Sequence, residues 1–575
     1  MALTLRRRVP ELWAAVLAVL LLGPALAPGY VLSYDMVWVP DLALRPGFLG
    51  LGSGLPRAVP SDLVVALADE IVPGMVLQKL VLLGALVGAG IGASRLAPGG
   101  LVPRLVAVTV YVWNPFVVER LVIGHWPVLV GYAVLPWVIE AGTAWRRGGR
   151  LPLRLLWLVP LGGLSAGAGL VTAVVLLAFA AGGRRTLPAV LLAAAGNAPW
   201  LVAGLLHAST ATTDAAGASV FALHDQGWLP GPVAALGLGG IWNSEVVPGS
   251  GGGTAAALGV VVLLALAGIG ARGWWRRHDG RERAAYLGCW SAGWLLAVLT
   301  WLSPDAVGWL VATVPGAGLV RDGARLLALC APLLAVAAAD GAATLWRHRP
   351  GAAVPRAALG LALVLAPVAA LPAAAWGASS SLRAVSFPDT WAAARQVVSG
   401  SVDRQPGDVL LLPLSSYRQP GWNGGVKVLD PLGRYLTPDY VAGDELVVSG
   451  TVVAGEDPRA GAAGEALALP TARERSARLA ELGIRVVVVD REAPGTAPPL
   501  EARTLWESPD LQVLELADPA RRDLPASWTV AMALALLAWG SPLVVALAGW
   551  LVRSRRLRSR VTQPAGRGRA GRKAC

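Results

Sequence analysis

The sequence predicts a polytopic α-helical membrane protein with a small α/β domain before its last membrane span. Of its 575 residues, 55% are hydrophobic and only 15% are charged, whereas soluble domains carry about 25% charged residues. Long apolar runs recur along the chain, and a bilayer-spanning helix needs about 20 such residues. From residue 377 to residue 525 the chain becomes polar, with short apolar runs, which indicates a domain outside the membrane.

The net charge of +13 does not indicate a nucleic-acid partner. The arginines cluster in short loops and in the tail 553–575, which contains no acidic residue. This pattern is typical of the cytoplasmic side of a multi-pass plasma-membrane protein. We therefore expect the lipid bilayer as the partner, both termini in the cytoplasm, and a basic disordered tail. The three cysteines show no pairing or metal-binding spacing, so a disulfide framework is not expected.

The basic loops fix the direction of each apolar run. "MALTLRRR" lies inside, so residues 11–29 run outward and residues 74–94 return. Residues 105–145 are too long for one span and predict a hairpin whose tip, residues 114–127, lies outside. A competing interpretation of the first run is a cleaved signal peptide, because basic residues, an apolar core and "ALA" occur in that order. Both interpretations place the first loop, residues 30–73, outside.

The run 153–182 lies between two basic loops and is too short for two full spans. Its Gly- and Ser-rich centre predicts two short or broken helices, which are tolerated where they line a cavity or pack on protein. The total is about 12 spans. The remaining predicted spans are 187–206, 254–271, 284–302, 324–346, 357–376 and 527–552.

The polar region 377–525 predicts a small extracytoplasmic α/β domain. "GDVLLLPL" and "LGIRVVVVD" have the composition of buried strands. "TARERSARLAEL" predicts an amphipathic helix directly before the second strand. The chain is thus divided into a membrane domain (1–376), this α/β domain, and a final transmembrane helix (526–552) that leads to the tail.

Charged residues at the predicted outer face gather in short clusters near span ends. Charges beside a membrane are costly unless they face water or a partner, so clustering favours a shared site over scattered solvated charges. The clusters lie in the first loop, in "VVERLVIGHW" and in "VRDGAR". Their members include Asp35, Asp41, Asp69, Glu70, Glu119, Arg120, His125, Arg321, Asp322 and Arg325.

Several segments resemble the GT-C superfamily of membrane glycosyltransferases. They are "SYDMVWVPD" after the first span, the hairpin "WNPFVVERLVIGHWPVLVGYAVLPW", "RDGARLLAL", and the polar segments "GDVLLLPLSSYRQPGWNGG" and "LAELGIRVVVVD". The last two are similar to the outer domain of YfhO-like members and of actinobacterial arabinofuranosyl- and mannosyltransferases. The resemblance implies a polyprenyl-phosphate sugar donor, a cell-envelope glycan or glycolipid acceptor, and a catalytic carboxylate in the first outer loop.

Asp35 occupies the position that this resemblance gives to the catalytic base. A carboxylate can accept the proton of a sugar hydroxyl as it attacks the anomeric carbon. Asp41 is six residues further on, so which of the two is the base stays open. Asp35 could also merely cap a short helix. Asp41 follows a proline and is also compatible with a turn or supporting role.

The negative charge of the leaving lipid phosphate is best stabilised by arginine. Arg321 and Arg325 are four residues apart and are predicted to share one helical face at a helix start, where an anion is favoured. Arg120 and His125 are further phosphate-binding candidates. The competing interpretation is that these arginines only lie at the membrane surface, although arginine is less common on the outer side of a membrane. Asp322 and Glu119 are predicted to orient these groups.

The acid pair Asp69 and Glu70 permits a divalent cation such as Mg²⁺ or Mn²⁺ without requiring one. A solvated anchor at the start of the second span is the competing interpretation. Two alternatives to a glycosyltransferase stay open. A transporter or flippase of lipid-linked sugars should show internal repeats and midplane charges, and neither is visible. A catalytically silent GT-C-like scaffold would carry the same layout with degenerate motifs.

Overall fold

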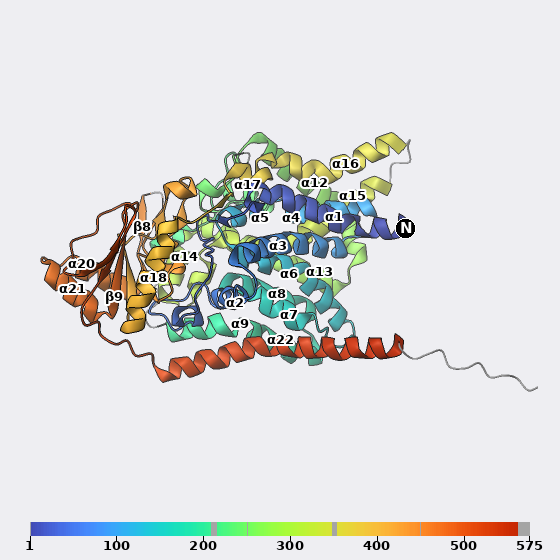
Figure 1. Ribbon diagram of the computed structural model, residues 1–575. Helices are drawn as coiled ribbons and strands as arrows, with labels where there is room; N and C mark the ends of the chain where they lie inside the picture. The colour runs from blue at the N-terminus through green and yellow to red at the C-terminus, as the bar shows by residue number, and fades with distance from the viewer. Residues whose placement is uncertain are drawn as a thin grey trace, which may run out of the picture.

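A bundle of long helices carries an α/β domain at one end (Figure 1). The computed structural model describes residues 2–208, 215–249, 251–314, 316–347, 353–448 and 450–561. The N-terminus lies at the opposite end of the bundle from the α/β domain, and the long last helix runs from the domain to that far end (Figure 1). We call the end at which the α/β domain packs the domain end.

Within the described residues, eight helices are long and apolar enough to cross a membrane, or up to ten if each of two bent pairs is one span. The bent pairs are η6 (Gly323–Leu329) with α15 (Ala331–Arg347), at 47°, and α16 (Ala353–Ala370) with η7 (Pro372–Ala374) and α17 (Ala375–Ser380), at 72°. The other helices of this set are α1 (Ala2–Leu22), α3 (Gly74–Leu96), α4 (Leu101–Val112) continued by α5 (Pro115–Val122), α6 (Trp126–Arg146), α9 (Thr186–Leu206), α12 (Thr254–Arg277), α13 (Gly280–Leu302) and α22 (Ala526–Val561).

The prediction of about 12 spans is therefore not confirmed, and the difference lies in residues 153–182. This region forms two short helices, α7 (Leu155–Gly162) and α8 (Ala166–Ala180), as its Gly-rich centre indicates. They pack against α6 and α9 inside the bundle. At the break, a side chain on Gly163 would lie 2.0 Å from the Gly196 carbonyl oxygen. Helix α9 therefore occupies the space beside the break.

The predicted hairpin tip, residues 114–127, is mostly helical. Asn114 caps α5 by accepting a hydrogen bond from the Val117 amide at 3.0 Å, so the helix restarts after only two residues, Trp113 and Asn114, outside α4 and α5. The actual turn is the short segment 123–125. At the other end of the chain, α22 continues to Val561, so the first part of the predicted disordered tail is helical. Residues 562–575 lie outside the described residues.

The α/β domain contains a five-stranded sheet in the order β10-β11-β9-β3-β6. Strands β3 (Asp408–Leu412) and β9 (Ile484–Asp490), both predicted from the sequence, pair in parallel. Alternate residues of β3 serve two cores: Val409 and Leu411 pack toward α18, and Leu410 and Leu412 pack toward α20 and α21. Burial on both faces explains why these strands are continuous apolar runs. The other elements of the sheet and its layers are β6 (Tyr440–Val441), β10 (Arg503–Glu507), β11 (Leu511–Glu515), α18 (Asp389–Arg404), α20 (Pro458–Leu467) and α21 (Ala472–Glu481).

Short elements connect the long helices, and several of them lie where the bundle meets the α/β domain. Strand β1 of the first loop pairs with β2, just before the α/β domain. The short strands are β1 (Tyr30–Val31), β2 (Ala384–Val385), β4 (Tyr417–Arg418), β5 (Val428–Leu429), β7 (Leu446–Val448) and β8 (Thr451–Val453). The short helices are η1 (Gly23–Leu26), η2 (Pro46–Leu49), α2 (Ser61–Ala68), η3 (Gly183–Arg185), α10 (Ala216–Val220), α11 (Gly231–Leu236), η4 (Ser244–Val246), α14 (Pro304–Thr313), η5 (Ala317–Val320), η8 (Gly421–Asn423) and α19 (Leu432–Tyr435).

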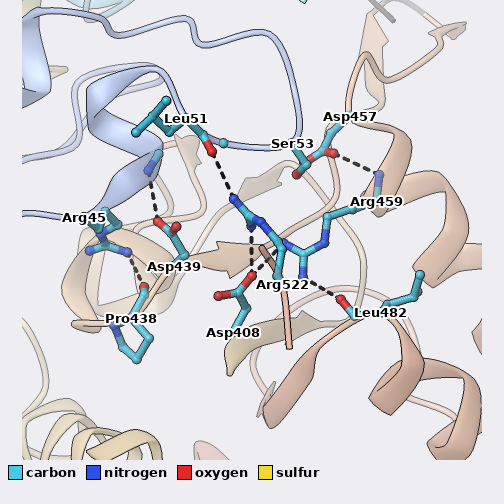
Figure 2. Close-up of polar contacts among 12 residues, drawn as sticks. Arg45, Leu51, Ser53, Asp408, Pro438, Asp439, Asp457, Arg459, Leu482 and Arg522 are labelled. Atoms are coloured by element: carbon cyan, nitrogen blue, oxygen red, sulfur yellow. Dashed lines mark hydrogen bonds and ion pairs between the residues drawn. The ribbon is translucent and has the colours of Figure 1, made fainter. Parts of the chain in front are cut away.

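Ionic contacts fasten the first loop to the α/β domain (Figure 2). Buried Arg45 donates to the Pro438 carbonyl at 2.7 Å and to three neighbouring carbonyls. Arg522 donates to the Leu51 carbonyl at 3.0 Å and to the Asp408 carboxylate at 3.0 Å. A guanidinium that bridges two chain segments in fixed geometry holds them at a fixed distance. The first loop therefore has the α/β domain on one side and the helix bundle on the other.

Candidate active site

The position of Asp35 is set by a tight turn between the hairpin tip and the α/β domain. The Asp35 amide donates to the Ile123 carbonyl at 3.0 Å, and the Tyr34 amide donates to the Lys427 carbonyl at 2.7 Å. Gly124, with φ +86°, lies against this turn, and a Cβ there would sit 2.1 Å from the Met36 nitrogen. Only glycine allows this approach. The turn is thus held from both sides by backbone contacts.

The Asp35 carboxylate has one partner from the bundle and one from the α/β domain. Its Oδ2 lies 2.9 Å from His125 Nε2, and its Oδ1 accepts a hydrogen bond from the Tyr417 hydroxyl at 2.5 Å. The side chain nevertheless remains 39% exposed. Because each carboxylate oxygen can accept more than one hydrogen bond, Asp35 retains the capacity to accept another from an incoming group.

The partners of His125 fix its tautomer. Its Nδ1 lies 3.1 Å from Arg120 Nη1, and a guanidinium can only donate. Nδ1 must then accept, so the proton sits on Nε2 and is donated to Asp35. Burial lowers the pKa of His125, the Asp35 carboxylate raises it, and the charges of Arg120 and Arg325 lower it, with a net decrease. His125 is therefore neutral at pH 7.

Asp35 is ionised at neutral pH. Burial raises the pKa of its carboxyl, but hydrogen bonds from His125 and Tyr417 and the charge of Arg57 lower it further, with a net decrease. Hydrogen bonds to the charged form of a carboxylate have this effect. An ionised, partly exposed carboxylate can act as a proton acceptor when it takes up the proton during the reaction.

Asp322 connects this group to a second arginine. Its carboxylate accepts two hydrogen bonds from Arg120, at 2.9 and 3.0 Å, and both side chains are almost fully buried. It also contacts Arg325 Nη2 at 3.2 Å and caps η6 through the Arg325 amide at 3.2 Å. A continuous chain of polar contacts thus runs from Asp35 through His125, Arg120 and Asp322 to Arg325.

The prediction that Arg321 and Arg325 share one helical face is wrong. The segment forms two 3₁₀ turns, η5 and η6, separated by Arg321 and Asp322, so the i,i+4 geometry of an α-helix does not apply. Arg321 instead contacts Glu456 of the α/β domain at 3.2 Å and stacks on the Phe221 ring at 4.8 Å. The buried Nε of Arg325 has no hydrogen-bond partner among the described residues.

The remaining predicted residues lie beside this chain of contacts. Asp41 is 58% exposed and pairs with Arg395 of α18 at 2.5 Å. Buried Glu119 accepts a hydrogen bond from Gln226, so it does not orient Arg120 directly. Asp69 accepts from the Leu42 amide at 2.8 Å, which ties two parts of the first loop together at the end of α2.

Glu70 follows Asp69 and is exposed. Three or more His, Cys, Asp or Glu side chains do not come together at any point in the described ranges in a way that could hold a metal ion. Burial, and the nearby charges of Asp41 and Glu70, raise the pKa of Asp69.

Two residues of the site were not predicted from the sequence. Tyr417 lies in β4 of the α/β domain and reaches Asp35 across 382 positions of sequence. Arg57 lies in an irregular part of the first loop, within electrostatic reach of Asp35. Neither belongs to a spacing motif. The only available signal was their membership of segments that the topology places at the same face.

The fold and these contacts define a polytopic helical membrane protein with a polar site at its domain end. No protein-family model and no curated protein matches the chain. The structure is similar to that of arabinofuranosyltransferase AftD from mycobacteria, with a TM-score of 0.55 and 17% sequence identity over 90% of this chain. A mutant of the same enzyme matches with a TM-score of 0.50 and 17% identity, again over 90% of this chain.

The chain spans only 40 to 42% of the length of these two structures. At 17% identity the similarity concerns the fold alone. At the level of the fold, it confirms the GT-C-like resemblance expected from the first loop, the hairpin and "RDGARLLAL". Function has to be argued from the site itself.

Proposed function

We propose that the protein is a membrane glycosyltransferase that transfers a pentose or hexose from a polyprenyl-phosphate donor to an extracytoplasmic cell-envelope glycan or glycolipid. The observation that carries the proposal is the Asp35 carboxylate, which is ionised, partly exposed and oriented by His125 and Tyr417. Similarity of fold to an arabinofuranosyltransferase supports the same reaction class. The proposal includes insertion in the plasma membrane by several spans, with both termini in the cytoplasm. This orientation is supported by the positions of the N-terminus and the end of α22, which lie far from the site (Figure 1).

In this reaction the acceptor hydroxyl oxygen attacks the anomeric carbon of the donor. The bond between that carbon and the phosphate oxygen breaks, the hydroxyl proton passes to Asp35, and the lipid phosphate leaves with the bonding electrons. Because the pKa of Asp35 is low, proton transfer accompanies the attack instead of preceding it. Holding the two substrates beside one another supplies much of the remaining acceleration.

The leaving phosphate gains negative charge that cationic groups must stabilise. Arg325 suits this role, because its side chain is partly exposed and its Nε is unengaged in the described part of the chain. Arg120 is buried in its ion pair with Asp322, and His125 is engaged with Asp35. This placement favours positioning roles for Arg120, His125 and Asp322 over direct contact with phosphate.

The test is transfer of a labelled sugar from a polyprenyl-phosphate donor by the purified protein. Asp35→Asn keeps the size of the side chain but removes the proton acceptor, and transfer should fall about 10²- to 10⁴-fold. Asp305→Asn, at an exposed position of α14, is the matched control and should transfer like the wild type. Undiminished transfer by Asp35→Asn would remove Asp35 as the base.

Asp41→Asn in the same assay decides which aspartate is the base. Asp41 is paired with Arg395, whereas His125 contacts Asp35, so the loss of Asp41 should cost less than tenfold, as expected for a solvent-exposed ion pair. If Asp41→Asn abolishes transfer and Asp35→Asn does not, the roles of the two aspartates are reversed.

A further inference from the structure

Glu456 of the α/β domain lies between two arginines that come from separate parts of the membrane domain. Its Oε1 contacts Arg321 at 3.2 Å, and its Oε2 contacts Arg57 at 3.5 Å. Glu456 is 9% exposed, whereas Arg57 is 51% exposed. One carboxylate therefore bridges two cations, using a different oxygen for each.

The two arginines need an anion between them. Like charges at close range repel, and Arg321 cannot turn away freely because its guanidinium stacks on Phe221 at 4.8 Å. Glu456 supplies one negative charge to two positive charges, so a net positive charge remains on this group. The lipid monophosphate that leaves the donor carries up to two negative charges and more acceptor oxygens than a carboxylate, which makes it the better bridging anion for the same pair.

The group also lies at the proposed reaction site. Arg57 is within electrostatic reach of Asp35 and of Tyr417. Arg321 is in electrostatic reach of Arg325, which belongs to the chain of contacts that leads to Asp35. A phosphate held by these arginines would thus be bound beside the carboxylate that is proposed to act on the sugar.

The backbone that carries Glu456 is fixed, so only its side chain is free to move. The amides of Glu456 and Asp457 donate to the same Asp444 oxygen at 2.6 and 2.7 Å. Asp457 accepts a hydrogen bond from Ser53 of the first loop at 3.1 Å, and the two side chains lie together in Figure 2. A Cβ on Gly54 would lie 2.9 Å from the Asp457 Cβ. The α/β domain is thereby held against the loop that carries Arg57.

We propose that Arg57 and Arg321 form a binding site for the lipid phosphate that leaves the donor, which the Glu456 carboxylate occupies until that phosphate displaces it. This inference rests on the proposed function for the identity of the ligand. Displacement requires no chemical step, because one anion replaces another on the same two guanidinium groups. The α/β domain thus supplies a competing anion that lowers the affinity of the empty site for phosphate.

The test measures binding directly, without sugar transfer. A short-chain prenyl monophosphate is titrated into the full-length protein in detergent, with the prenyl alcohol and inorganic phosphate as separate arms. Glu456→Gln keeps the shape of the side chain but removes the competing charge, and should bind the prenyl monophosphate about tenfold more tightly. Glu465→Gln, at an exposed position of α20, is the matched control and should bind like the wild type.

Arg57→Gln tests the same site from its exposed side, where folding is not at risk. It should weaken binding of the prenyl monophosphate, and adding Glu456→Gln to it should recover much less affinity than in the wild-type background. An equal gain for inorganic phosphate supports a site for the headgroup alone, and a larger gain for the prenyl monophosphate supports a site for the whole lipid. Unchanged or weaker phosphate binding by Glu456→Gln, or a gain with the prenyl alcohol, would overturn the inference.

The two proposals fail separately. If no variant or wild-type protein transfers sugar but Glu456→Gln still tightens binding of the prenyl monophosphate, the glycosyltransferase proposal is lost and the lipid-phosphate site stands. If transfer depends on Asp35 but replacing Glu456 or Arg57 leaves phosphate binding unchanged, the lipid-phosphate site is lost and the glycosyltransferase proposal stands.

Discussion

Replacing Asp322 with alanine should destabilise the protein strongly, because Asp322 is the buried counterion of Arg120. The Arg120 side chain is 1% exposed and that of Asp322 is 4% exposed, and two hydrogen bonds of 2.9 and 3.0 Å join them. Removal of one member of such a pair leaves an uncompensated buried charge and costs about 3–5 kcal/mol. Arg325, the other partner of Asp322, still reaches solvent and adds less.

The assay is denaturant unfolding of the purified protein in detergent, followed by tryptophan fluorescence. Glu245→Gln is the matched control, because its ion pair with Lys427 is largely exposed and should contribute no more than about 1 kcal/mol. The double replacement Arg120→Met with Asp322→Leu removes both charges and should recover most of the stability, since an apolar pair of similar volume can replace a buried ion pair.

A loss below about 1 kcal/mol for Asp322→Ala would show that water compensates the charge of Arg120. Equal stability of Asp322→Leu and the double variant would likewise refute the uncompensated charge as the cause. The double variant should still transfer sugar poorly, because His125 loses the donor that fixes its tautomer.

Tyr417→Phe removes the hydroxyl that donates to Asp35; transfer should fall about tenfold, and the acid limb of its pH profile should move to higher pH as the pKa of Asp35 rises. Asp490, at the end of β9, should make stability depend on pH, because burial and the charge of Asp430 raise its pKa to about 6. The stabilising effect of its protonated form is complete below the unfolded pKa of about 4 and is lost as pH rises through about 6, by up to ~3 kcal/mol. About 1.4 kcal/mol of this loss falls between pH 5 and pH 8, and Asp490→Asn should abolish it when unfolding is compared at these two pH values.

An unshifted acid limb in Tyr417→Phe would reduce Tyr417 to a packing residue of β4, even if the rate falls. For Asp490, the same decrease in stability between pH 5 and pH 8 in the wild type and in Asp490→Asn would assign the pH dependence to another group.

Much of the architecture was predictable because it follows from length and composition. The runs 74–94, 187–206, 254–271 and 284–302 all lie within helices of the structure. The strands 408–412 and 484–490 were predicted for the same kind of reason, since a strand buried on both faces is an unbroken apolar run. The α21 helix begins with a capping box between Thr471 and Glu474, a local signal that needs no tertiary partner.

The predictions failed where a helix depends on its neighbours. The total of about 12 spans counted residues 153–182 as two spans, but the two short helices expected from its Gly- and Ser-rich centre, α7 and α8, are too short to count as spans. Arg321 and Arg325 have α-helical spacing, but the backbone there forms 3₁₀ turns. Spacing arguments assume a regular helix, and nothing local in "VRDGAR" shows that the assumption fails.

The sequence by itself indicated that this chain lies in a membrane, that the first loop and the hairpin tip share one face, and that Asp35 lies at that face. These properties depend on apolar length and on the placement of arginine, which are local. Only the tertiary structure decided the partners: Tyr417 and His125 on Asp35, Arg120 on Asp322, and Glu456 between Arg57 and Arg321. Each of these contacts joins residues from separate turns or domains, and which side chains then meet is set by how the helices and the α/β domain pack.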